Sequence, residues 1–147
     1  MAHKLILQKP FQGMGFIWNV SAHVGCKASC PNRPTDVELV KFLFREYLKR
    51  QTFQRLKPTC SSPPITLNGS FDAILGFWIY STEDWPGATS DGVISPARGM
   101  TYGPGGLWVI SLLNGNLFKA APDFWAGIGQ NSELSPALRA ELAKTSP

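Results

Sequence analysis

The residues of this chain that could carry metal or nucleophile chemistry lie close together near its N-terminus. His23, Cys26 and Cys30 could act as three metal ligands, with Cys60 as a fourth. Structural zinc sites favour cysteine pairs with two intervening residues, however, and three residues separate Cys26 from Cys30. We therefore predict no metal site. The odd number of cysteines argues against a disulfide framework, which leaves a local disulfide between Cys26 and Cys30, or reduced structural thiols, as the alternatives.

Groups for other catalytic chemistry are few. A pairing of His23 with a cysteine nucleophile needs only that the two meet in space, but nothing around the cysteines resembles a nucleophile turn. The only histidines are His3 and His23, too few for the usual zinc peptidase site. Glu83, Asp84 and Asp91 could supply the carboxylate pair of a glycan hydrolase, although solvation and turn capping explain them more simply. The sequence predicts a protein that is not an enzyme and binds no cofactor.

Binding is easier to motivate, because sugar rings are held by aromatic faces together with planar hydrogen-bonding groups. The segment from Glu83 to Gly103 is long for a loop in a compact domain, and long ordered loops often meet ligands. Trp85 within it could also simply pack beneath its own loop. The candidate ligand-binding residues at helix ends or in this loop are Tyr80, Trp85, Asp91, Arg98, Tyr102 and Asn114.

Charge is unevenly distributed along the chain. Residues 1–57 hold ten Lys or Arg against three acids, whereas residues 58–147 hold four against seven. Lys41, Arg45 and Lys49 follow one another at helical i, i+4 spacing and are the candidate basic surface. Such a surface could meet a cell-wall glycan, nucleic acid or an acidic protein. The alternative is an ordinary solvated helix face.

The elements that must position these residues can be placed from the apolar pattern. Residues 15–25 alternate between apolar and polar positions, which predicts a half-buried strand that pairs with a shorter strand at His3 to Gln8. On that strand Asn19 and His23 should face away from the core. With 44% hydrophobic residues in 147, the chain can bury a core without metals or disulfides.

Four helices are expected after the strands. The first should run from Asp36 to Phe53 with Thr35 as its N-cap and with one polar face. The second, residues 70–82, is apolar nearly all round, which is typical of a central buried helix. The third should span residues 104–114, and the last residues 136–144 with Ser135 as its cap.

The order of these motifs resembles the peptidoglycan-binding domain family, a small three-helix module of bacterial wall hydrolases. Asp36-Val37 followed by Leu39-Val40 and Leu43 resembles the first-helix pattern of that family, with Lys41 where glutamine is usual. Asn68-Gly69-Ser70-Phe71 resembles its Asp-Gly turn into the second helix. Asp91-Gly92-Val93-Ile94-Ser95-Pro96 resembles the second Asp-Gly turn, with Ser95 in place of glycine.

The resemblance implies a mainly α fold and a binding role. The expected chain is a single domain, residues 1–147, with a peptidoglycan-binding-like core over residues 32–114. Residues 1–31 and 115–147 are expected to be additions, a β-hairpin or strand and a helical extension. The function implied is that of a non-catalytic bacterial or phage protein that binds peptidoglycan in the cell wall or serves as an adaptor. Fold reuse makes this an inference by analogy.

Two other functions compete with that expectation. One is a structural component of a phage tail or contractile secretion system, and the other is a small peptidoglycan-degrading effector. Nucleic acid is disfavoured as a partner because the basic residues are not interleaved with aromatic residues along a groove. No signal peptide and no membrane-spanning stretch are expected, so the chain would be made in the cytoplasm and reach the envelope or the outside by a non-classical route.

Overall fold

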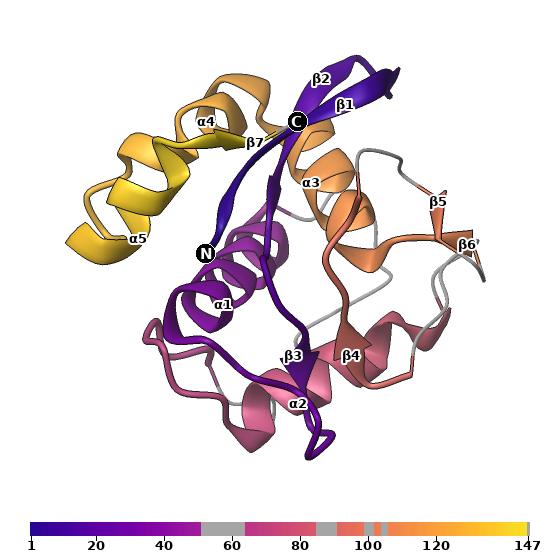
Figure 1. The fold of residues 1–147 in the computed structure, drawn as a ribbon, viewed down its shortest axis with the longest axis vertical. Coiled ribbons are helices and arrows are strands. Elements are labelled where there is room, and N and C mark those ends of the chain that lie inside the picture. Colours follow the sequence, from indigo (N-terminus) through magenta and orange to yellow (C-terminus); the bar gives the residue numbers. More distant parts are fainter. Residues whose placement is uncertain (51–63, 85–90, 99–101, 104–105, 147) are drawn as a thin grey trace.

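The computed structural model describes residues 1–50, 64–84, 91–98, 102–103 and 106–146. Along this part of the chain, strands both precede and follow the first two helices, and one more strand follows the last helix (Figure 1). The protein is therefore a mixed α/β fold, and the expectation of a mainly α, three-helix core is wrong. The physical reason is that segments expected to be loops contain two-residue strands that pair by backbone hydrogen bonds. Such short strands leave no periodic pattern in the sequence.

The N-terminal hairpin consists of β1 (His3–Phe11) and β2 (Met14–Asn19). Its strands pair antiparallel, with Phe11 opposite Met14, and both turn residues between them have positive φ, 51° at Gln12 and 92° at Gly13. That two-residue turn matches the right-handed twist of the strands. The hairpin confirms the expected pairing of two N-terminal strands, although β2 ends at Asn19 and a separate strand follows.

Five further strand segments in the described part of the chain are short, with two residues each. β3 (Val24–Gly25) pairs antiparallel with β4 (Val93–Ile94), and β5 (Tyr102–Gly103) pairs with β6 (Gly106–Leu107). β4 and β5 fall inside the segment that we expected to be one long loop. Near the C-terminus, β7 (Thr145–Ser146) runs parallel to β1 and completes the three-stranded sheet β2-β1-β7.

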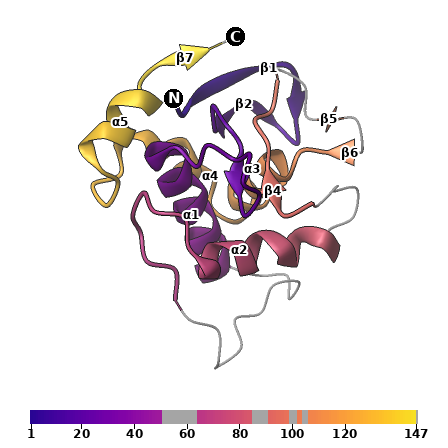
Figure 2. The same cartoon turned by 60° about the horizontal axis from the view of Figure 1, so that its bottom comes forward.

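Helix α1 (Pro34–Lys49) crosses the middle of the molecule and is buried along most of its length (Figure 2). Its N-cap is Arg33, which makes no side-chain cap bond, so the expected capping by Thr35 is wrong. Pro34 starts the helix because its fixed φ suits the first turn. Residues 51–53, where we expected α1 to end, lie outside the described residues.

Buried acids on α1 tie it to distant parts of the chain. The carboxylate of Asp36 accepts hydrogen bonds from the backbone N–H groups of Ser21 and Ala22, at 2.9 and 3.1 Å, and from the Ser21 hydroxyl. The carboxylate of Glu38 accepts bonds from the backbone and the hydroxyl of Ser135, both at 2.6 Å. The predicted polar face of this helix therefore points in part into the protein, where its acids replace water as hydrogen-bond partners.

Helix α2 (Ala73–Tyr80) is shorter than expected and is followed by the 3-10 helix η2 (Ser81–Asp84). Its N-cap is Asp72, whose side chain accepts a bond from the backbone of Leu75 at 2.8 Å. It lies across one end of α1, at the edge of the molecule (Figure 2). The prediction of a central buried helix is wrong, because one side of α2 faces solvent.

The remaining helices form the C-terminal half. The expected third helix, residues 104–114, is shifted: α3 begins at Val109, after β6, and residues 104–105 lie outside the described residues. Ser135 caps the last helix through a bond from the backbone of Leu138 at 3.2 Å, as predicted. The elements are α3 (Val109–Ala120), α4 (Pro122–Ala126), the 3-10 helix η3 (Ile128–Gln130) and α5 (Pro136–Leu142).

One cluster of buried apolar residues runs from the first strand to the last helix. It includes Leu5 and Trp18 of the hairpin, Phe42 of α1, Trp125 of α4 and Leu138 of α5. The terminal segments, expected as additions to a core at residues 32–114, therefore contribute to the same apolar interior. No helix in the described part of the chain is both long and apolar enough to cross a membrane.

Candidate functional site

Asn114 lies at the centre of the molecule and not on a ligand surface. Its side chain is fully buried. The amide oxygen accepts from the Trp18 backbone and from the Trp125 indole N–H, both at 2.9 Å, and the amide nitrogen donates to the carbonyls of Trp18 and Ile110. Every hydrogen-bonding position of the amide is used within the chain, so the expectation that Asn114 binds a ligand is wrong.

Lys41 is not part of a basic surface. Its side chain is fully buried, and its ammonium group donates to Asp72 at 2.6 Å and to Asn68 at 2.9 Å. Burial acts to raise the pKa of Asp72, but the bonds from Lys41 and from the Leu75 backbone outweigh it and lower that pKa. The lysine therefore ties the start of α2 to α1. Helical spacing alone did not reveal this, because the partner is thirty-one residues away.

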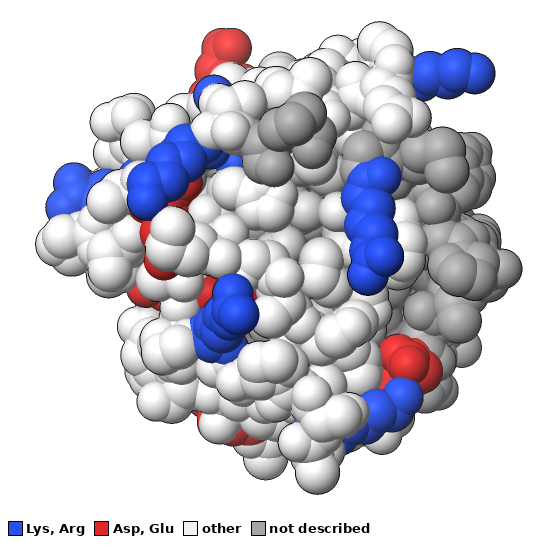
Figure 3. Space-filling view, in the orientation of Figure 1, with Lys and Arg blue, Asp and Glu red and all other residues white. Residues whose placement is uncertain are grey.

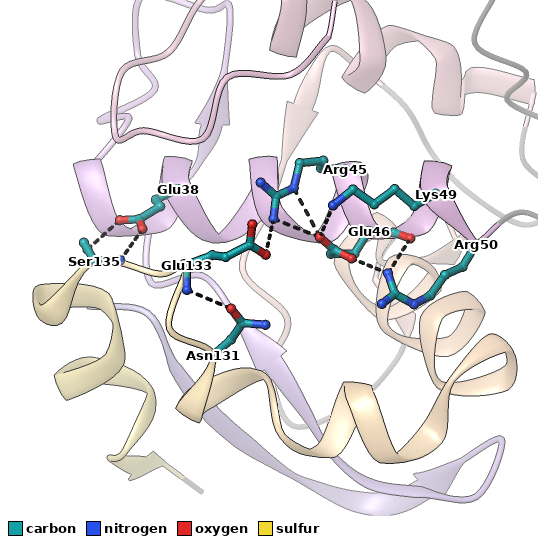
Figure 4. Close-up of polar contacts among 8 residues, drawn as sticks. All are labelled: Glu38, Arg45, Glu46, Lys49, Arg50, Asn131, Glu133 and Ser135. Carbon is teal, nitrogen blue, oxygen red and sulfur yellow. Dashed lines mark hydrogen bonds and ion pairs between the residues drawn. The ribbon is translucent and has the colours of Figure 1, made fainter.

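Arg45 and Lys49 also form ion pairs with acidic residues, as Figure 4 shows. Both contact the carboxylate of Glu46, which is 2% exposed and is also bound by Arg50. Arg45 additionally reaches Glu133, at 2.8 Å, in the segment before α5. Burial acts to raise the pKa of Glu46, but the bonds from Lys49, Arg50 and Arg45 hold it below the ordinary value. Of the predicted basic stripe, Lys41 is thus fully buried, while Arg45 and Lys49 are partly exposed and pair with the buried carboxylate of Glu46.

Positive charge is also dispersed elsewhere. On the face drawn in Figure 3, the Lys and Arg side chains stand in separate spots with uncharged surface between them. Such spacing gives no continuous track for a polyanion on that face. The excess of basic residues in the first part of the sequence is therefore not a single basic patch there.

Among the residues that the structure describes, the most exposed aromatic rings lie on α2. Phe77 is 55% exposed and Tyr80 is 49% exposed, whereas Leu75, Trp78 and Ile79 of the same helix are buried. Residues three apart lie on one helix face, so the two exposed rings are neighbours. An eight-residue helix made almost entirely of apolar residues cannot bury every side, because only one side meets the core.

A tight turn brings polar groups to this helix. The hydroxyl of Tyr80 lies 3.6 Å from Sγ of Cys26. Gly92 has a φ of 77°, and a Cβ at this position would lie 3.0 Å from the Tyr80 hydroxyl and 3.2 Å from the Cys26 sulfur. Only glycine fits there without strain. The turn therefore holds Gly92, the residue after Asp91, closely against Tyr80.

Asp91 pairs with Lys27 at 2.7 Å, and both side chains are about half exposed. The hydrogen bond from Lys27 to Asp91 is the main reason that the pKa of Lys27 lies above its ordinary value. We name Phe77, Tyr80, Lys27 and Asp91 the α2 surface. It combines two aromatic faces with one donor group and one acceptor group, which is the combination that binds sugars or polar peptides.

The other predicted ligand residues are distributed differently. Arg98 is exposed and follows Ala97, which pairs with the buried side chain of Asn19 on β2. Trp85 and the side chain of Tyr102 lie outside the described residues. Of the six predicted residues, the structure thus shows Tyr80 and Asp91 together. The burial of Asn19 also corrects its expected outward orientation, whereas His23 is exposed as predicted.

Sequence reasoning missed Phe77 and Lys27. Phe77 was assigned to a buried helix, and its exposure could have been anticipated from the all-round apolar composition of a short helix. Lys27 had no signal, because its partner Asp91 is sixty-four residues away.

The cysteine and histidine cluster shows free thiols. Cys26 is exposed and Cys30 is half-buried, while Cys60 lies outside the described residues. Nδ1 of His23 lies 3.1 Å from the hydroxyl of Ser95. In the part of the chain that the structure describes, no three residues of the metal-binding types come together as a site.

Comparison with known proteins adds no relative. No protein-family model matches the chain, and no curated protein or solved structure is significantly similar to it. The functional argument therefore depends on the geometry of this chain.

Proposed function

We propose that this chain is a non-catalytic binding module that holds a cell-wall glycan at the α2 surface. The observation that carries the proposal is the pair of half-exposed rings, Phe77 and Tyr80, beside the ion pair of Lys27 and Asp91. An aromatic face covers the apolar side of a sugar ring, while a carboxylate and an ammonium group bind its hydroxyls. The separate positions of the Lys and Arg side chains on the face drawn in Figure 3 favour a weakly charged polymer over a polyanion.

The use of polar groups elsewhere supports a binding role over a catalytic one. Asp36, Glu38 and Glu46 are buried acids whose oxygens accept hydrogen bonds from named donors inside the chain. A general acid or base needs instead a carboxyl group that reaches a substrate proton. These three acids serve the fold.

The resemblance to peptidoglycan-binding modules supports the choice of ligand. The turn at Asp91-Gly92, one of the motifs behind that resemblance, packs Gly92 against Tyr80, and the adjacent Asp91 pairs with Lys27. The turn at Asn68-Gly69 serves the fold, since the Asn68 side chain accepts from the Ser70 backbone at 3.0 Å and from Lys41. Only the first of these turns contributes to the proposed site.

A second candidate function uses the same helix. Ala73 is exposed one turn before Phe77, so the apolar side of α2 continues beyond the polar groups. A protein partner in a phage tail or contractile secretion machine would bury this longer apolar strip. A glycan would engage only the end with Tyr80 and Asp91.

Co-sedimentation with purified peptidoglycan sacculi tests the first proposal. Binding should persist as NaCl rises from about 0.1 to 1 M, because contacts to sugar rings are little screened. Phe77→Ala and Tyr80→Ala should each weaken binding about tenfold, since burying the exposed half of such a ring stabilises by roughly 1 to 1.5 kcal/mol. Ile6→Ala is the matched control, because Ile6 is 43% exposed on β1, away from α2.

A second pair of variants separates recognition from nonspecific charge. Lys27→Ala should weaken binding at every salt concentration, whereas Lys119→Ala at the end of α3 should not. If both lysine variants weaken binding and salt abolishes it, the contact is electrostatic and the glycan proposal is wrong. If the unmodified protein does not sediment with sacculi at any salt concentration, the adaptor function is favoured.

A further inference from the structure

The loop between β3 and α1 is a small closed structure with two cysteines on opposite arms. At its base, the side-chain amide of Asn32 donates to the carbonyl of Gly25 and accepts from its N–H, both at 2.9 Å. Near its tip, the N–H of Cys30 donates to the carbonyl of Lys27 at 2.9 Å. Cys26 lies on one arm between these two rungs, and Cys30 lies on the other arm at the rung nearer the tip.

The two sets of hydrogen bonds keep the arms of the loop close, and the expected distance between the arms is compatible with a disulfide. Arms bridged by paired hydrogen bonds run about as far apart as neighbouring strands, roughly 5 Å. Disulfides join residues whose Cα atoms are about 4.4 to 6.8 Å apart. Burial is the main cause that raises the pKa of the Cys30 thiol, and the charge of Cys26 acts in the same direction.

We propose that Cys26 and Cys30 form a redox-active dithiol that exchanges with external disulfides and closes an intramolecular disulfide. Cys26 is the entry point because it is exposed, and Cys30 resolves the intermediate because it is half-buried. The proposal does not depend on glycan binding. The loop would then exist in a reduced form with two free thiols and in an oxidised form closed by a disulfide.

The exchange has two steps. The Cys26 thiolate attacks one sulfur of a low-molecular-weight disulfide, whose S–S bond breaks, and the departing thiolate takes a proton from water. The Cys30 thiol then loses its proton to water and its thiolate attacks Sγ of Cys26, which breaks the mixed disulfide and releases the second thiol. The dithiol is oxidised by two electrons, and the external disulfide is reduced to two thiols.

Oxidation would also change one edge of the α2 surface. In the reduced form, Sγ of Cys26 lies 3.6 Å from the hydroxyl of Tyr80 and 3.9 Å from the carbonyl of Gly92. A disulfide sulfur carries no proton to donate to either oxygen. The sulfur would instead be directed toward Cys30, along the loop.

The test uses the full chain, glutathione disulfide as oxidant and mass spectrometry after thiol alkylation. Because Lys27 separates the two cysteines, trypsin cuts the loop, and only a disulfide keeps the two resulting peptides together. We expect this linked pair in the unmodified protein and equally in Cys60→Ser. Cys30→Ser should instead accumulate a stable glutathione adduct at Cys26. A mixed disulfide that persists in the unmodified protein, linkage through Cys60, or two alkylated thiols after oxidation would each overturn the proposal.

A variant of the loop base tests the positioning. Asn32 has a φ of 45°, so Asn32→Gly keeps that backbone conformation accessible and removes only the amide that bridges to Gly25. Disulfide closure should become severalfold slower, while the rate of the first attack at Cys26, measured in a Cys30→Ser background, stays the same. Equal closure rates with and without the amide would contradict the role assigned to the loop.

Discussion

The interior around α1 and α3 contains buried polar side chains, whereas the surface of α2 contains exposed apolar ones. In the interior, Asn114 and Lys41 are buried and paired with partners far away in the sequence, and Glu46 is buried and paired with basic residues of its own helix. On α2, the large apolar rings of Phe77 and Tyr80 stand in solvent. Buried polar groups that are fully paired specify one arrangement, whereas exposed aromatic rings add little to folding. The comparison separates residues that maintain the fold from residues whose side chains are about half exposed.

The largest effect should come from Asn114. Asn114→Leu keeps the volume but leaves the buried N–H groups of Trp18 and Trp125 without their acceptor. At about 1 to 3 kcal/mol for each group, we expect a loss of roughly 4 kcal/mol in the free energy of unfolding. Urea denaturation measures it. Asn116→Leu on the same helix, at a partly exposed position, is the control and should change stability by less than about 0.5 kcal/mol.

The second-largest loss of stability should come from disrupting the ion pair between Lys41 and Asp72. Asp72→Asn leaves a buried ammonium group with only Asn68 as a partner and should lower the unfolding free energy by about 2 to 3 kcal/mol, less than for a fully buried pair because Asp72 is one-third exposed. Lys41→Met removes the charge itself and should cost less. A Lys41→Met variant that is less stable than Asp72→Asn would mean that the aliphatic packing of the lysine matters more than its charge.

The contribution of Glu46 to the stability of the interior should depend on pH. Its folded pKa lies below the ordinary 4.5, so the stability from its ion pairs is present above about pH 4.5 and is lost as the pH falls through the folded pKa. Glu46→Gln should cost about 2 kcal/mol at pH 7, and the difference from the unmodified protein should shrink below pH 4.5. Urea midpoints between pH 7 and pH 3 measure this. A constant difference across that range would show that the charge of Glu46 is not what matters.

The smallest effect on stability should come from the α2 surface. Phe77→Ala removes a half-exposed ring and should change the unfolding free energy by less than about 0.5 kcal/mol. Leu75→Ala, on the buried side of the same helix, should cost about 3 kcal/mol. Thermal unfolding of the two variants compares them directly. If Phe77→Ala is as destabilising as Leu75→Ala, the ring belongs to the core and the distinction between the two regions fails.

The periodicity of the sequence predicted where helices and strands lie better than it predicted which sides of them are buried. The hairpin, the helix that starts near Asp36 and the capped C-terminal helix were all anticipated, because alternation, helical spacing and a capping serine are local signals. The second helix was predicted as a helix but assigned to the centre, since its composition indicates apolarity and not which side meets the core. The pairing of β3 with β4 was not predicted, because two-residue strands have no period to detect.

The sequence predicted two residues of the candidate site, Tyr80 at a helix end and Asp91 in a turn motif. Asp91-Gly92 is a local turn signal, and the structure shows that turn next to Tyr80. Asn114 was misassigned because an asparagine near a helix end has the same local pattern whether it is exposed or buried. Its burial follows from Trp18 and Trp125, one of which is ninety-six residues away.

Local sequence was enough to locate the first hairpin, the starts of several helices and the turn at Gly92, because each depends on backbone preferences within a few residues. Tertiary structure alone decided which charges are buried and which rings are exposed. Lys41, Arg45 and Lys49 have the spacing of a solvated face, yet Lys41 is fully buried against Asp72, while Arg45 and Lys49 pair with the buried carboxylate of Glu46. Burial and charge pairing depend on contacts across long separations, and those contacts exist only once the chain has folded.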